Sequence, residues 1–153
     1  AVFRERLLPL ATVVTPNAFE LGRLTGRTAL AQDDAIAAAR ELLARGPQWV
    51  IAHSVEGGPG ELVTLAVSAD EVWRWGSEHL PVDVAGTGDV LLSLTLGFVL
   101  RGEPMHLAIS RAIAGVHAAL EATLAADVEE FDVHSAAPAA KLPPGRFRGQ
   151  RVA

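Results

Sequence analysis

Two patterns of apolar and polar residues alternate along this chain: short apolar runs typical of strands, and apolar residues at the spacing of a helix. Short apolar, β-branched runs that end at turn residues indicate strands, and these fall at residues 11–16, 48–54, 62–68 and 71–77. Apolar residues at helical spacing indicate helices, and these fall at residues 17–26, 31–46, 88–100 and 104–125. The order predicts an α/β fold whose sheet becomes partly antiparallel after Ser54, where two strands follow each other as a hairpin.

Residues at the predicted helix ends support these boundaries. Asn17 can cap the first helix and Gly26 can end it, while Asp33 or Asp34 starts the second helix. Pro104 suits the first turn of the last helix. The buried stripe of the second helix is predicted to contain Ala35, Ile36, Ala39, Leu42 and Leu43.

Two segments are rich in residues that break regular structure. Residues 55–61, "VEGGPGE", predict a mobile connector, because glycine adds conformational freedom. The tail at 136–153 is rich in Pro and Gly, so we expect it to lie over the surface or to end in an edge strand. Trp73 and Trp75 share one strand face and are interpreted, with Trp49, as packing residues.

Composition narrows the functional class. The chain has 153 residues, 50% of them hydrophobic, with net charge −5 and a pI near 5.5, so nucleic acid and anionic membranes are poor partners. It contains no cysteine, and its histidines lack metal-ligand spacing, which argues against a thiolate or zinc site. Its most apolar stretch, residues 90–100, is too short to span a bilayer. We therefore expect a cytoplasmic protein.

The segment "VAGTGDVLLSL" places turn residues and one carboxylate directly before an apolar helix. Gly86, Thr87 and Gly88 would leave the amides at the helix start accessible to an anion such as a phosphate. Asp89 would then stand beside that phosphate as a base for an attacking hydroxyl. The alternative is a simple turn and cap, which these residue types also form.

A second polar pair follows the first predicted strand. Asn17 and Glu20 are three residues apart at a helix start, so they face the same side of one turn. An amide and a carboxylate can hold the water shell of Mg²⁺, which is commonly bound by one or two carboxylates together with phosphate oxygens. The alternative is a capping pair without a metal.

Together these segments resemble the ribokinase-like kinases, and among them the pyridoxal kinases. The matching words are "TPNAFE", "ARELLARGPQWVIAHS", "LVTLAVSADEVWRW" and "AGTGDVLLSLTLGFVLRG", in the family's order and spacing. The similarity runs from about Leu8 to Leu124. It implies the C-terminal half of a three-layer α/β/α domain with a mixed sheet, formed by residues 1–153 as a single partial domain.

The resemblance assigns roles in ATP-dependent phosphorylation of the 5′-hydroxymethyl group of pyridoxal, pyridoxine or pyridoxamine. Asp89 is implied as the catalytic base, with the amides of Gly86, Thr87 and Gly88 around the transferring phosphate. Asn17 and Glu20 are implied to serve Mg²⁺ and the ATP phosphates. The nucleotide is implied to lie near Ser54 and the adenine near Val116 and His117. His53 stands where many relatives have Thr and some have His, so its role stays open.

Several expectations follow from where the chain departs from the family. The first half of the family's domain is missing, so we expect a fragment that is inactive alone. The resemblance also implies a homodimer for the full-length protein. A monovalent cation such as K⁺ is a further implied cofactor. Two alternatives remain: a hydroxymethylpyrimidine or sugar kinase of the same fold, and a nucleotide-binding fragment without catalysis.

Overall fold

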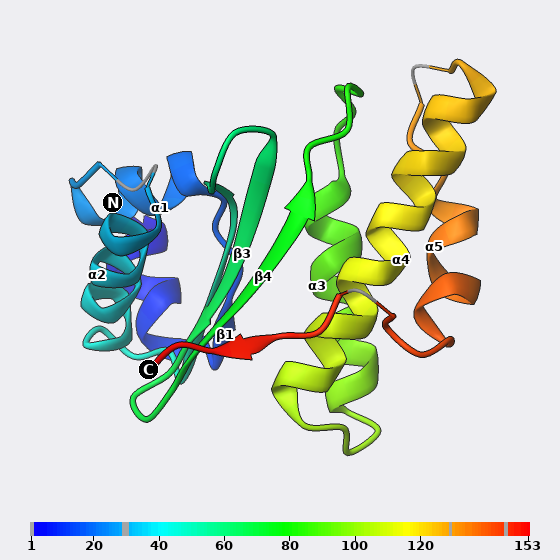
Figure 1. The fold of residues 1–153 in the computed structure, drawn as a ribbon. Coiled ribbons are helices and arrows are strands. Elements are labelled where there is room, and N and C mark those ends of the chain that lie inside the picture. Colours follow the sequence, from blue (N-terminus) through cyan, green and yellow to red (C-terminus); the bar gives the residue numbers. More distant parts are fainter. Residues whose placement is uncertain (1, 29–30, 129, 146) are drawn as a thin grey trace. The chain divides into compact units, whose positions relative to one another are not determined.

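The computed structural model describes residues 2–28, 31–128, 130–145 and 147–153, and Arg146 of the predicted tail lies outside them (Figure 1). The chain divides into two compact units, one of Ala1–Glu78 with Gln150–Ala153 and one of His79–Gly149.

The first unit is built on a five-stranded mixed sheet in the order β1-β2-β3-β4-β5. Its strands are β1 (Val13–Val14), β2 (Trp49–Glu56), β3 (Glu61–Val67), β4 (Val72–Glu78) and β5 (Gln150–Arg151). β1 and β2 are parallel, and the other neighbours are antiparallel. The predicted hairpin after Ser54 is therefore confirmed, and the tail ends in an edge strand paired with β4, as expected.

Helices α1 (Ala18–Thr25) and α2 (Gln32–Leu43) pack beside the sheet, and Figure 1 shows them together near β1. A π-helix (Phe3–Leu7) and a 3₁₀-helix (Leu8–Leu10) precede β1. The predicted caps Asn17 and Gly26 are confirmed for α1. The core holds small and branched side chains from both layers, including Leu21, Ala35, Ala38, Ala39, Leu42, Val50, Val63 and Leu65.

The second unit is helical. It contains α3 (Thr87–Val99), α4 (Met105–Ala126) and α5 (Val133–Ala140). The three helices contact one another, and Gly115 of α4 faces α5 so closely that a Cβ there would stand 2.7 Å from the Ala136 carbonyl oxygen. The predicted surface tail is wrong for residues 136–140, because these belong to α5, where Ala136 and Ala140 are buried.

Helix α4 is the longest apolar segment. Within the part of the chain that the structure describes, it is the one helix long and apolar enough, by length and composition, to cross a membrane. Half of the apolar part of this helix is buried inside the protein, as expected for the core helix of a bundle.

Candidate active site

The first predicted pair, Asn17 and Glu20, lies where β1 leads into α1. The Asn17 Oδ1 atom accepts a hydrogen bond from the Glu20 amide at 2.8 Å, and Glu20 Oε2 accepts one from the Asn17 amide at 3.0 Å. This is a complete capping box, which satisfies two backbone donors at the helix start. The capping interpretation of the pair is therefore confirmed, and a metal role has to coexist with it.

Residues in the second half of β2 lie directly beside this pair. The His53 amide donates to the Pro16 carbonyl at 3.1 Å, and Asn17 and His53 form a parallel bridge. Since β1 and β2 are parallel, both run towards the same end of the sheet, and α/β proteins bind ligands at the carboxyl ends of parallel strands. The structure thus brings four candidate residues together: Asn17, Glu20, His53 and Ser54.

Ser54 has an unusual backbone. Its φ angle is +56°, in the left-handed region that residues with a Cβ seldom adopt. The pairing of β2 with β3 shifts register between Ala52 and Val55, so Ser54 lies in an irregular stretch of the strand. Its exposed hydroxyl is 3.2 Å from His53 Nδ1. Strain of this kind is typical of functional positions, because the surrounding structure has to hold it in place.

The predicted anion site lies in the second unit, at the start of α3. Gly86 is the N-cap residue with φ +94°, and it carries no side-chain cap. The helical hydrogen-bond ladder begins with the Val90 amide, which donates to the Gly86 carbonyl at 3.1 Å. The amides of Thr87, Gly88 and Asp89 precede that ladder, as the first amides of any helix do.

Asp89 belongs to the first turn of α3 and is exposed. Its backbone carbonyl accepts a hydrogen bond from the Ser93 hydroxyl at 2.7 Å, which ties the first turn to the second. An exposed carboxylate beside unpaired helical amides can take a proton from a hydroxyl while a phosphate binds those amides. The roles of these amides and of Asp89 in phosphoryl transfer stay predictions.

Val116 and His117 lie on α4 and differ in exposure. His117 is 4% exposed, its Nδ1 atom is 3.1 Å from Glu121 Oε1, and its ring centroid is 4.9 Å from that of Phe147. Val116 is half-buried. The His117 ring is therefore held inside the second unit, beside Glu121 and Phe147. A contact of either with adenine stays a prediction.

The donor chemistry near β1 fits magnesium better than a transition metal. Among the described residues, no group of three or more His, Cys, Asp and Glu side chains could hold a metal ion. Mg²⁺ needs fewer protein ligands, since it keeps waters and takes phosphate oxygens from its substrate. The capping bond engages one oxygen of Glu20, and a carboxylate has further acceptor positions on both oxygens. Glu20 can therefore cap α1 and face a hydrated magnesium ion.

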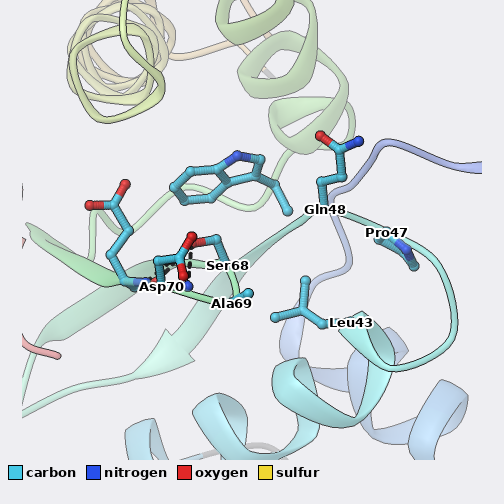
Figure 2. A pocket seen from close by; sticks show the side chains of 8 residues that line it. Leu43, Pro47, Gln48, Ser68, Ala69 and Asp70 are labelled. Atoms are coloured by element: carbon cyan, nitrogen blue, oxygen red, sulfur yellow. Dashed lines mark hydrogen bonds between the residues drawn. The ribbon is translucent and has the colours of Figure 1, made fainter.

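A pocket of about 460 Å³ lies at the other end of the central strands, where β2 begins, and the sequence did not predict it. It is lined by the end of α2, the start of β2 and the β3–β4 turn, with Leu43 and Pro47 opposite Ser68 and Asp70 in Figure 2. Trp49, interpreted from the sequence as a packing residue, is half-buried and lines it. None of the predicted site residues contributes to this pocket.

Solved kinases share this fold. Pyridoxal kinase from Entamoeba histolytica matches with a TM-score of 0.85 and 25% identity, over 95% of this chain and 53% of that one. Pyridoxal kinase from Trypanosoma brucei matches with a TM-score of 0.82 and 29% identity, over 92% and 51%. A Staphylococcus aureus pyridoxal kinase in complex with ADP matches with a TM-score of 0.68 and 27% identity, over 78% and 44%. The fold is that of the ribokinase-like kinases, an α/β class with a mixed sheet.

Within that class the chain belongs to the phosphomethylpyrimidine kinase family, whose sequence profile matches residues 1–134. A pyridoxal kinase from Rubrobacter xylanophilus is 38% identical over 98% of this chain and 53% of its own length. A pyridoxine/pyridoxal/pyridoxamine kinase from Bordetella bronchiseptica is 38% identical over 86% of this chain and 47% of its own length. The chain spans about half the length of these relatives and matches their C-terminal part. The resemblance to pyridoxal kinases drawn from the sequence is thus confirmed.

Proposed function

We propose that this chain supplies the ATP-binding and proton-accepting part of a kinase that phosphorylates the 5′-hydroxymethyl group of B6 vitamers. The observation that carries the proposal is the start of α3, where uncapped amides adjoin the exposed carboxylate of Asp89. The names of its relatives and the ADP complex of a similar structure support the same chemistry.

In this mechanism the amides of Thr87 and Gly88 hold the oxygens of the transferring phosphoryl group. Asp89 accepts the proton of the vitamer hydroxyl. The oxygen of that hydroxyl attacks the γ-phosphorus of ATP, and the bond between this phosphorus and ADP breaks. Glu20 and Asn17 would hold the water shell of a bound magnesium ion, whose charge would offset that of the phosphates, and Ser54 would contact the nucleotide. Positioning and fixed charges supply most of the acceleration in such transfers.

A second candidate is favoured by the family profile, which is that of phosphomethylpyrimidine kinases. The same amides and carboxylate would serve a hydroxymethylpyrimidine or a sugar hydroxyl equally well. The test is to measure phosphorylation of five acceptors by the complete gene product: pyridoxal, pyridoxine, pyridoxamine, hydroxymethylpyrimidine and ribose. Preference for a B6 vitamer supports the proposal, and preference for another acceptor reassigns the substrate.

The remaining alternative is a nucleotide-binding protein without catalysis. It predicts ATP binding with no turnover of any acceptor by the complete gene product. The same preparation can test the associated expectations of a homodimer and a K⁺ requirement, by light scattering and by replacing K⁺ with Na⁺ in the assay. Localisation in the cytoplasm is tested by fractionation of the source cells.

A further inference from the structure

The loop of Gly57, Gly58, Pro59 and Gly60, here called the glycine loop, joins β2 to β3. It follows Ser54 by three residues and begins where β2 ends at Glu56, six residues beyond Val50, the last β2 residue paired with β1. Two backbone hydrogen bonds close the turn, from the Gly57 amide to the Glu61 carbonyl at 3.1 Å and from the Glu61 amide to the Gly58 carbonyl at 2.9 Å.

The Glu61 side chain folds back onto this loop. Its Oε2 atom accepts a hydrogen bond from the Gly58 amide at 3.1 Å and one from Arg74 Nη2 at 2.7 Å. The hydrogen bond from Arg74, followed by that from Gly58, lowers the pKa of the Glu61 carboxyl. The glycine loop is therefore tied through one carboxylate to the neighbouring strand β4.

The Glu61 carboxylate fits beside two residues that have no side chain, Gly57 and Gly76. A Cβ at Gly57 would overlap Glu61 Oε2, and a Cβ at Gly76 would overlap Glu61 Oε1. Arg74 also donates from Nε to Gln32 Oε1 at 2.8 Å, which extends the connection to the first turn of α2. The side chains of Glu61 and Arg74 together thus link the glycine loop, strands β3 and β4, and helix α2.

We propose that Glu61 is a positioning residue for the nucleotide, because it holds the glycine loop in one shape beside Ser54. This inference rests on the proposed function. A loop with three glycines among four residues has many accessible conformations, and ordering such a loop on binding weakens affinity. Charge-assisted hydrogen bonds to Glu61 order the loop in advance. Arg74 also offsets the negative charge that Glu61 would otherwise present to a polyphosphate.

Calorimetry with ATP and Mg²⁺ on the complete gene product tests this role. We expect Glu61→Ala to raise the Kd about tenfold, with a less favourable binding entropy and faster hydrogen exchange at the Gly58 amide. Glu61→Gln keeps an acceptor for that amide and should lose less. The matched control is Glu71→Ala, which removes an acidic partner of Arg151 in the β3–β4 turn, at the other end of β3 from the glycine loop, and should leave the Kd unchanged.

The outcomes separate the two proposals. If the wild-type protein binds ATP and Glu61→Ala binds equally tightly, the positioning role is wrong and the proposed function stands. If Glu71→Ala weakens binding as much as Glu61→Ala, the effect is general destabilisation, and the positioning role is again wrong. If the wild-type protein binds no ATP, the proposed function is wrong, and so is this inference, which rests on it.

Discussion

Asn17 and Glu20 exchange hydrogen bonds between side chain and backbone at the start of α1, at 2.8 and 3.0 Å. The sequence predicts the same two residues as partners of magnesium, with capping as the alternative. Both roles can belong to one pair, because a capping box needs one oxygen of each side chain and leaves the ionic charge of Glu20 in place. The two roles therefore have to be separated by experiment.

Two substitutions of Glu20 make that separation. Glu20→Gln keeps a side chain that can complete the capping box, so we expect its thermal stability to be unchanged but its Mg²⁺ requirement to rise. Glu20→Ala removes both functions and should also cost about 1 kcal/mol of unfolding free energy. Activity titrated against Mg²⁺ and thermal unfolding are the two measurements. An unchanged magnesium titration in both variants would leave Glu20 as a cap alone.

Replacing Asp89 tests the proposed base. Asp89→Asn keeps the shape of the side chain but cannot accept the proton, so turnover should fall by about 100-fold or more with ATP affinity nearly unchanged. Steady-state kinetics and ATP binding on the complete gene product measure the two quantities. The matched control is Asp83→Asn, an exposed aspartate on the segment before α3, which should retain wild-type turnover. Full activity of Asp89→Asn would remove the mechanism.

Substitutions of Ser54 test whether the residue with the strained backbone also contacts the nucleotide. Ser54→Gly relieves the strain of the positive φ angle but gives the unfolded chain more conformational freedom. We expect the free energy of unfolding to rise by up to about 1 kcal/mol as the net result. Ser54→Ala keeps the strain and removes the hydroxyl beside His53. Both variants should bind ATP more weakly if the hydroxyl contacts the nucleotide. Denaturant unfolding and ATP calorimetry report the two effects, and wild-type affinity in both variants would exclude that contact.

Gly115 tests the packing of the helical unit. A methyl group there meets the Ala136 carbonyl at 2.7 Å and Leu94 Cδ1 at 2.9 Å, so Gly115→Ala should destabilise this unit by about 1–3 kcal/mol. Gly97 lies inside α3 with nothing within 4 Å of the same position, so Gly97→Ala should gain about 0.5–1 kcal/mol. Denaturant unfolding compares the two. Equal effects would mean that α4 and α5 do not approach as closely as described.

Acid should weaken the fold through Glu61. Its carboxyl has a lower pKa in the folded protein than the ordinary value of 4.5, chiefly because of the Arg74 hydrogen bond. Such a group contributes stability above pH 4.5 and loses it as the pH falls through the lowered pKa. The effect is small, since a third of the side chain is exposed. Melting temperatures measured downward from pH 6 should fall less in Glu61→Gln than in the wild-type protein, and identical slopes would contradict this.

Most elements could be predicted because their signals are local. The caps of α1 and the shared face of Trp73 and Trp75, whose ring centroids are 6.4 Å apart, follow from residue type and period. Helix α5 was missed because Pro138 lies inside it and argued against a helix. Asp132 caps that helix, accepting from the His134 amide at 3.1 Å and the Ser135 hydroxyl at 2.7 Å, and packing against α4 stabilises it further.

The centre of the α2 stripe also differed from expectation. Ala38 is fully buried, whereas Ile36 and Leu43 are only partly buried. Periodicity gives the angular width of an apolar face, but contact with the sheet decides where its centre lies. Small alanines occupy that centre because they let the helix approach the strands closely.

By itself, the sequence determined the order of most strands and helices, the family and the residue types available for phosphoryl transfer, since these depend on short-range pattern and motif spacing. Only the tertiary structure decided that Asn17 and His53 meet across parallel strands, that Ser54 is strained and that Glu61 closes onto the glycine loop. These features arise between residues far apart in the chain or from backbone angles imposed by neighbours, and no local pattern encodes them.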